Sequence, residues 1–204
     1  MLDELWTDLQ QQLDARGLTI RRGVIQGATF ITADSGHVKA DTPRDDQART
    51  RRSRDGTWAK KGKRSPFGYT LHTLIDREWQ LIRRLATTTA SLHDSRIDLL
   101  KSGEMVYRDK GHFSIKPAAS MHGQYHASGS EEPSALLQRE TTEPGDQPYT
   151  GPCRETLPVI KRYVGAGHVL VTIVARVHLA TMFACFGYNL LHLCTIQRTI
   201  FHER

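Results

Sequence analysis

The segment MVYRDKGHF, residues 105–113, is typical of a buried strand that ends in charged residues. Its apolar start predicts the strand, and Gly111 ends the pattern. The charged residues between them include one carboxylate, Asp109, which the strand would deliver to the end of a sheet. There Asp109 could take part in chemistry or simply cap a turn. This segment alone leaves both interpretations open.

Upstream stretches predict the rest of the sheet. Residues 18–33 (LTIRRGVIQGATFITA) have the pattern of two strands, with Gly27 inside the second. Residues 67–76 and 79–90 predict a hairpin, and residues 91–100 (SLHDSRIDLL) predict one or two helical turns. The expected result is a sheet of about four strands with a helix between the third and the fourth.

Helices are predicted near both ends of the chain. Leu5, Leu9 and Leu13 recur at helical spacing, and Gly17 is a stop signal. After strand-like residues 158–177, residues 177–196 contain no Asp, Glu, Lys or Arg and are about long enough to span a bilayer. Their apolar residues also follow helical spacing, which favours a buried amphipathic helix over a membrane span.

A strongly basic loop is predicted at residues 42–65. It is too polar to form core, so it is expected to be exposed. Trp58 lies inside it, where an aromatic ring could stack on a base while cations neutralise phosphates. A solvated loop with an incidental tryptophan is the alternative. The candidate DNA-binding residues are Arg49, Arg51, Arg52, Arg54, Trp58, Lys60, Lys61, Lys63 and Arg64.

Composition limits the remaining choices. The formal net charge of +6 and the pI near 9.4 favour a polyanionic partner. Three cysteines without metal-ligand spacing indicate neither a disulfide framework nor a zinc site, and no secretory signal is evident at the start. A cytoplasmic protein is expected. Residues 118–157 are rich in Gly, Ser, Pro, Glu and Gln and predict an irregular insert between residues 1–117 and 158–204.

Several of these blocks together resemble one family of proteins. The blocks, in order, are ARTRRSRDGTWAKKGKRSPFGYTLHTLID, TTTASLHDSRIDL, VYRDKGHF, VIKR and VTIVARVHLATMFACFGYNLLHL. They resemble the DDE transposases of insertion-sequence family five. The resemblance covers most of residues 1–117 and 158–198.

The resemblance implies an α/β, RNase H-like fold: a mixed sheet flanked by helices, here with a long irregular insert. It implies three acidic residues that bind two Mg²⁺ ions and transfer phosphoryl groups of DNA. Such chemistry needs carboxylates because Mg²⁺ prefers oxygen ligands and two metal ions clamp the attacking and leaving oxygens. DNA is the implied partner, and a homodimer is compatible with it.

Only one of the three acids is matched clearly. Asp109 holds the second acidic position and would be the metal ligand, whereas Gly27 holds the first. Asp34 is a fallback candidate, although seven strand residues span roughly 23 Å. The family's third acid would fall at Arg154, and its neighbour Glu155 would point about 100° away on a helix.

The loss of the third acid suggests a change of reading frame. Family members have the motif ERPY directly before the VIKR block, and codons for residues 154–157 can encode ERPY when read one base forward. The earlier family motifs fit the same frame. We therefore predict that about residues 122–157 are frameshifted. Members of the family also carry a helical domain before the first helix, so the resemblance implies a shortened chain.

Two functions from different classes remain. The first is transposase-type cleavage and strand transfer, impaired in this copy because two of three carboxylates are missing. The alternative is a non-catalytic DNA-binding remnant that acts through the basic loop. A poorly folded product that associates with membranes through residues 177–196 is a third interpretation.

Overall fold

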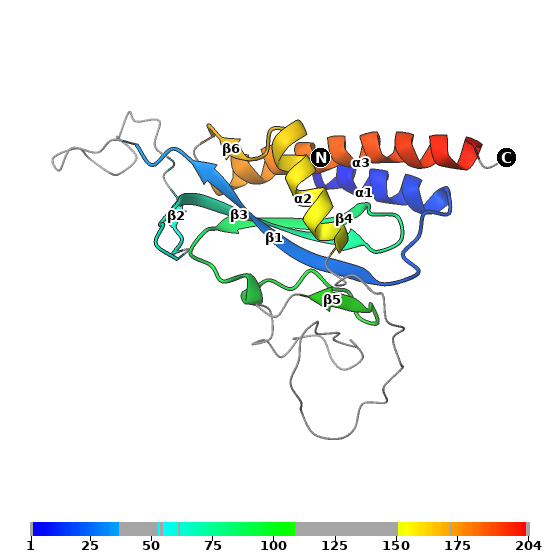
Figure 1. Ribbon diagram of the computed structural model, residues 1–204, viewed down its shortest axis with the longest axis horizontal. Coiled ribbons are helices and arrows are strands. Elements are labelled where there is room, and N and C mark those ends of the chain that lie inside the picture. Colours follow the sequence, from blue (N-terminus) through cyan, green and yellow to red (C-terminus); the bar gives the residue numbers. More distant parts are fainter. Residues whose placement is uncertain are drawn as a thin grey trace, which may run out of the picture.

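A mixed sheet with helices on one side forms the described part of the protein (Figure 1). The computed structural model describes residues 2–36, 53, 55–60, 62–108, 151–171 and 173–202. The elements in these ranges are α1 (Leu2–Ala15), β1 (Val24–Ala33), β2 (Thr57–Trp58), β3 (Phe67–Asp76), β4 (Ile82–Thr89), the 3-10 helix η1 (Asp94–Arg96), β5 (Val106–Arg108), α2 (Gly151–Tyr163), β6 (His168–Val169) and α3 (Val174–His202).

Strand β1 is the centre of the sheet. It pairs antiparallel with β3, which pairs antiparallel with β4 and with the short β2. The short strands β5 and β6 pair parallel with β1, at residues 24–26 and 32–33 respectively. The sheet therefore consists of the antiparallel hairpin of β3 and β4, the central strand β1 next to β3, and two short strands that run parallel to β1.

The two faces of the sheet are covered differently. On one face, Tyr69 and Leu71 of β3 pack in a core with Ile160 of α2 and Val177 of α3. Leu74 of β3 faces the opposite side and packs with Val24, Val106 and the segment that follows η1. Figure 1 shows the three helices on the same side of the sheet. We call this side the helix face and the other side the open face.

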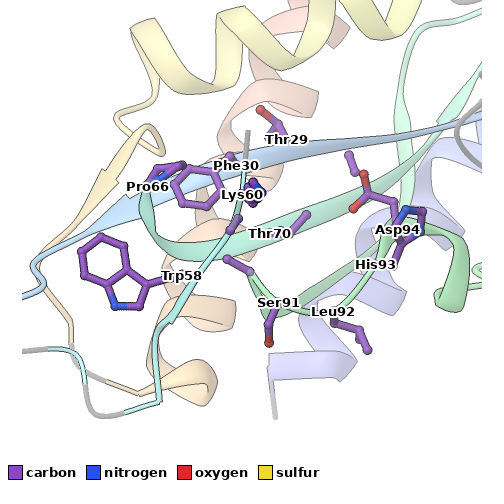
Figure 2. Close-up of a pocket in the computed structure, with 13 residues that line it drawn as sticks. Thr29, Phe30, Trp58, Lys60, Pro66, Thr70, Ser91, Leu92, His93 and Asp94 are labelled. Carbon is purple, nitrogen blue, oxygen red and sulfur yellow. The ribbon is translucent and has the colours of Figure 1, made fainter. Parts of the chain in front are cut away.

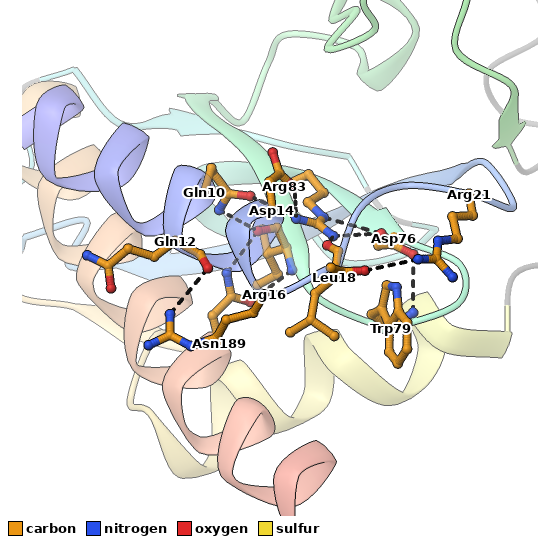
Figure 3. Close-up of polar contacts among 12 residues, drawn as sticks. Gln10, Gln12, Asp14, Arg16, Leu18, Arg21, Asp76, Trp79, Arg83 and Asn189 are labelled. Atoms are coloured by element: carbon orange, nitrogen blue, oxygen red, sulfur yellow. Dashed lines mark hydrogen bonds and ion pairs between the residues drawn. The ribbon is translucent and has the colours of Figure 1, made fainter. Parts of the chain in front are cut away.

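Polar contacts attach α1 and α3 to the start of β4 (Figure 3). The guanidinium of Arg83 lies 2.9 Å from the buried carboxylate of Asp76 and 3.3 Å from Asp14 of α1. It also donates to the carbonyl oxygen of Leu18. The buried amide of Asn189 on α3 accepts from the backbone N–H of Ile82 and donates to its C=O, both at 2.8 Å. Satisfying buried backbone groups in this way avoids a desolvation penalty.

Gly68 allows β1 and β3 to approach closely where they pair near the start of β3. A Cβ atom at this position would overlap the carbonyl oxygen of Ile31. Glycine is therefore required by the backbone itself rather than by a turn.

Several predicted elements are confirmed. The first helix is α1, which ends before Gly17 with its φ of 78°. The predicted hairpin is β3 and β4, and the apolar C-terminal helix is α3. The fold class, an α/β chain with a mixed sheet flanked by helices, also holds.

Three local predictions were wrong. Residues 18–23 form no strand, because Gly23 takes a φ of 83° and turns the chain directly into β1. The predicted helix after β4 is only the 3-10 turn η1. The strand-like pattern after residue 157 belongs in part to α2, which contains Pro158 and buries Leu157 and Ile160 at helical spacing.

Helix α2 also bears on the predicted irregular insert. It begins at Gly151, inside residues 118–157, so residues 151–157 are helical. Residues 109–150 lie outside the described residues, and so does most of the stretch predicted to be frameshifted.

Helix α3 satisfies the length and composition of a membrane span. Within Val174–Thr199, an 18-residue window has a mean hydropathy of 1.4, and 33% of that window is buried inside the protein. One side of α3 packs on the sheet through Val177, Cys185 and Tyr188. Burial raises the pKa of the Cys185 thiol to about 12, as expected for a cysteine in the core. This packing is what the interpretation as a buried amphipathic helix requires.

Candidate functional site

The end of β5 lies beside Gly27, the position predicted for the family's first acid. Gln26 of β1 pairs with Arg108 of β5, the last described residue of that strand. Gly27 is the next residue of β1, and Asp109 is the next residue after β5 but lies outside the described residues. Ile25 and Ile31 both pack in the helix-face core, so alternation along the strand places Gly27 on the helix face.

Helix α2 packs over β1 on that same face. Its buried residues Leu157 and Ile160 share a core with Ile25 and Ile31. Arg154 lies in the first turns of α2, and the side chain of Glu155 is exposed. The three positions predicted for the family's acids thus belong to β1, the residue after β5, and α2.

Asp34, the fallback candidate for the first acid, makes turn contacts in the structure. It follows the end of β1, where its carboxylate accepts a hydrogen bond from the backbone N–H of Gly36 at 2.8 Å. Its carbonyl oxygen accepts from the backbone N–H of Ser53. This is the role of a turn-forming aspartate, as expected for the residue type.

The residues present do not fit a two-metal site. Within the described part of the chain, no group of three or more His, Cys, Asp or Glu side chains could hold a metal ion. Gly27 supplies no ligand, and the position predicted for the third acid is an arginine. Two Mg²⁺ ions need several oxygen ligands, and Asp109 alone would supply one carboxylate.

The basic loop is described only in part. Arg49, Arg51, Arg52, Arg54 and Lys61 lie outside the described residues. The other four candidates lie within the described residues, and the side chain of each is exposed. They are Trp58, Lys60, Lys63 and Arg64.

Trp58 and Lys60 line a cavity of about 460 Å³ (Figure 2). Its other walls come from β1, from Thr70 of β3 and from the segment that runs from Ala90 after β4 to Asp94. Because Thr70 and its partner Phe30 alternate with core residues such as Tyr69 and Ile31, the cavity lies on the open face.

An aspartate anchors the basic loop to the folded domain. Asp55 accepts hydrogen bonds from the hydroxyl of Tyr69 and, at 2.6 Å, from the backbone N–H of Val174 at the start of α3. Ser53 is buried and hydrogen-bonds to the same hydroxyl. Burial, together with the hydrogen bond to Asp55, raises the pKa of Tyr69 above its usual range. Ser53 and Asp55 are thus fixed against the helix face, three to five residues before Trp58.

Sequence reasoning did not identify Thr70, Ser91, His93 and Asp94 as candidates for a binding site. They come from β3 and from the segment after β4, and no motif joins them to Trp58. The pairing of β3 with both β2 and β4 brings them together.

Comparison with known proteins adds no relative. No protein-family model, curated protein or solved structure matches this chain.

Proposed function

We propose that this chain has the RNase H-like fold of the DDE transposases, binds DNA, and is impaired in DNA cleavage and strand transfer. Mg²⁺ would be the cofactor of the unimpaired reaction. The cysteine usage further suggests a cytoplasmic protein, and the family resemblance is compatible with a homodimer on DNA.

The observation that carries this proposal is the parallel pairing of β1 with β5. It ends at Gln26 and Arg108, and the residues that follow these in the sequence are Gly27 and Asp109. Adjacent parallel strands bring residues of the same register to neighbouring positions. The helix that packs over β1 carries Arg154 near its start. An acid at each of these positions would create a cluster suited to divalent metal ions.

Restoring the two missing acids tests this arrangement. We expect the variant Gly27→Asp/Arg154→Glu to bind Mn²⁺ or Mg²⁺ at least about tenfold more tightly than the unmodified chain, because affinity rises with the number of carboxylate ligands. Calorimetric titration measures the binding. Nicking of supercoiled plasmid in the presence of metal would then increase, and a further Asp109→Asn change should abolish both gains.

A matched control separates a specific site from a general gain in negative charge. The variant Ser102→Asp/Arg162→Glu makes the same change in charge at two exposed positions. It should leave metal affinity unchanged. If the two double variants bind metal equally, or if the restored variant folds normally and gains nothing, the proposal is wrong.

A second candidate function, non-catalytic DNA binding, is favoured by the exposed side chains of Trp58, Lys60, Lys63 and Arg64. Neutralising the three cations should weaken duplex binding. It should also make the dependence of log affinity on log salt concentration shallower, by about 0.9 for each phosphate that is no longer neutralised. Binding that is insensitive to salt would contradict this function.

The predicted change of reading frame can be tested on the gene. Codons for residues 154–157 that cannot encode ERPY in the shifted frame would refute it. That outcome would also remove the reason for placing the third acid at position 154, and with it the basis of the restored variant, whereas DNA binding through the basic loop would be unaffected.

A further inference from the structure

The cavity on the open face has different chemistry at its two ends. Figure 2 shows Trp58 at one end and His93 with Asp94 at the other, with Lys60 and Thr70 between them. A volume of about 460 Å³ is within the range of small-ligand sites. The cavity can therefore hold a ligand that has both an aromatic part and an anionic part.

The aromatic end presents a ring that is held but not covered. Trp58 lies on the edge strand β2 at the end of the cavity and is 56% exposed. Its ring packs edge to face on the ring of its strand partner Phe67, which belongs to the helix-face core, with 5.2 Å between centroids and 61° between planes. This contact restricts the ring of Trp58 before any ligand binds. A base that stacks on it would add apolar burial at little cost in side-chain entropy.

The middle of the cavity carries a cation. Lys60 lines the wall and is exposed, and Lys63 and Arg64 follow within the same basic loop. A lysine ammonium group binds a phosphate as a point charge with three donors. A phosphate next to a base stacked on Trp58 would meet this charge.

The polar end is held in place by contacts behind it. Asp94 lies 3.8 Å from the buried His72, whose Nε2 is 2.9 Å from the hydroxyl of Thr88. The backbone N–H of Ser91 donates to the hydroxyl of Thr57 at 2.8 Å, which ties this end to the strand that carries Trp58. The two ends therefore keep a fixed relation. A carboxylate at the far end repels phosphate and accepts from the amino or imino groups of a base.

We infer that this cavity binds unpaired nucleotides of single-stranded DNA. One base stacks on Trp58, the adjoining phosphate pairs with Lys60, and the neighbouring nucleotide reaches Thr70, Ser91 and Asp94. A base inside a duplex is stacked between its neighbours and cannot enter such a site without leaving the helix. This inference takes DNA as the partner from the proposed function but needs neither the metal site nor cleavage.

The test compares a short labelled single strand with a duplex of the same sequence, using fluorescence anisotropy. We expect at least about tenfold tighter binding of the single strand, because only unpaired bases can stack on Trp58. Trp58→Ala should reduce single-strand affinity by about 5- to 150-fold, the range found when a stacked aromatic is replaced. Trp58→Phe should retain most of the affinity, and Trp58→Ala should change duplex affinity by less than about twofold.

A second variant tests the cavity rather than the tryptophan alone. The side chain of Ser91 is exposed and lines the cavity, so Ser91→Phe should fold normally, fill the space and reduce single-strand binding as strongly as Trp58→Ala. Leu191→Ala and Lys101→Ala change exposed residues away from the cavity and should leave binding unchanged. Equal losses for single strand and duplex, or no loss in either cavity variant, would overturn the inference.

The remaining outcomes also decide between sources of the ligand and between proposals. A nucleoside monophosphate that binds as tightly as the oligonucleotide would assign the cavity to a free nucleotide and overturn the assignment to a DNA strand. Single-strand binding without any gain of metal affinity in Gly27→Asp/Arg154→Glu would support the cavity while contradicting the transposase proposal. A gain of metal affinity in that variant without single-strand binding would support the transposase proposal and contradict the inference about the cavity.

Discussion

The helix face and the open face of the sheet differ in how they are closed. On the helix face, residues of α2 and α3 that recur at helical spacing meet alternate residues of β1 and β3 in one continuous apolar core. On the open face, the irregular segment between β4 and β5 buries a smaller cluster around Val24, Leu74 and Val106 and leaves a polar cavity. The main apolar core thus lies on one face of the sheet, and the cavity proposed to bind DNA lies on the other.

The difference follows from the geometry of the covering elements. A helix presents a side chain to the sheet every third or fourth residue, so its contacts form a dense, periodic surface. An irregular segment such as residues 90–105 has no such period, and its backbone N–H and C=O groups need individual hydrogen-bond partners. The N–H of Ser91 donates to the hydroxyl of Thr57, and the N–H of Arg96 donates to the carbonyl oxygen of His93. The cavity lies where this covering is incomplete.

The largest expected effect is at the junction of α1 with the helix face. Replacing Arg83 with Met should lower the free energy of unfolding by about 3–5 kcal/mol, because it leaves the buried carboxylate of Asp76 without its ion pair. Urea unfolding monitored by circular dichroism measures the change. The loss would show that the helix face depends on a polar connection as well as on its apolar core.

Two variants sharpen this result. Asp76→Asn combined with Arg83→Met removes the buried charge but keeps the oxygen that accepts from the N–H groups of Glu78 and Trp79, so it should recover part of the loss. Asp14→Asn alters the exposed member of the cluster and should cost less than about 1 kcal/mol. If Asp14→Asn costs as much as Arg83→Met, burial is not the cause.

An intermediate effect is expected where the basic loop meets the helix face. Asp55→Ala removes the acceptor for the first N–H group of α3 and for the hydroxyl of Tyr69, so we expect a loss of about 1–2 kcal/mol. The pKa of Tyr69 should fall toward its ordinary value, because Asp55 helps to raise it. Ultraviolet titration of the tyrosinate measures this second change.

The matched control is Asp8→Ala, an exposed aspartate on α1. It removes the same side chain without a buried partner and should change stability by less than about 0.5 kcal/mol. A pKa of Tyr69 that stays the same in Asp55→Ala would contradict the assigned contact.

Local patterns predicted the parts of the fold that local physics determines. The leucines of α1 and the strand pair of β3 and β4 follow periods of the helix and strand, and both were confirmed. Local patterns did not predict helix α2, because Pro158 normally ends a helix and the residues before it are polar. Its apolar residues Leu157 and Ile160 are stabilised by the core, which no local pattern reveals.

The candidate site divides in the same way. Trp58 and Lys60 stand out in the basic loop by residue type, and their role in DNA binding stays a prediction. Ser91 and Asp94 do not stand out, because their relation to Trp58 depends on strand register and on the contact between Ser91 and Thr57. Alternation along β1 likewise places Gly27 beneath α2 only once the sheet is known.

The smallest expected effect is a pH dependence of the helix face. Burial lowers the pKa of His192 on α3, although the hydrogen bond from its ring to the carbonyl oxygen of Trp79 at 2.9 Å acts in the opposite direction. The folded state therefore binds a proton less readily than the unfolded state, in which a histidine titrates near pH 6.5. This contribution of His192 to the free energy of unfolding is fully present above that pH and is lost as the pH falls through the lower, folded pKa.

The variant His192→Gln, which keeps a donor for Trp79, tests this pH dependence. Its urea midpoints measured at about pH 7.5 and about pH 5.5 should differ less than those of the unmodified protein. If the two proteins show equal differences, His192 has the same pKa in the folded and the unfolded state. Burial at this position of the helix face would then not disfavour protonation of its ring.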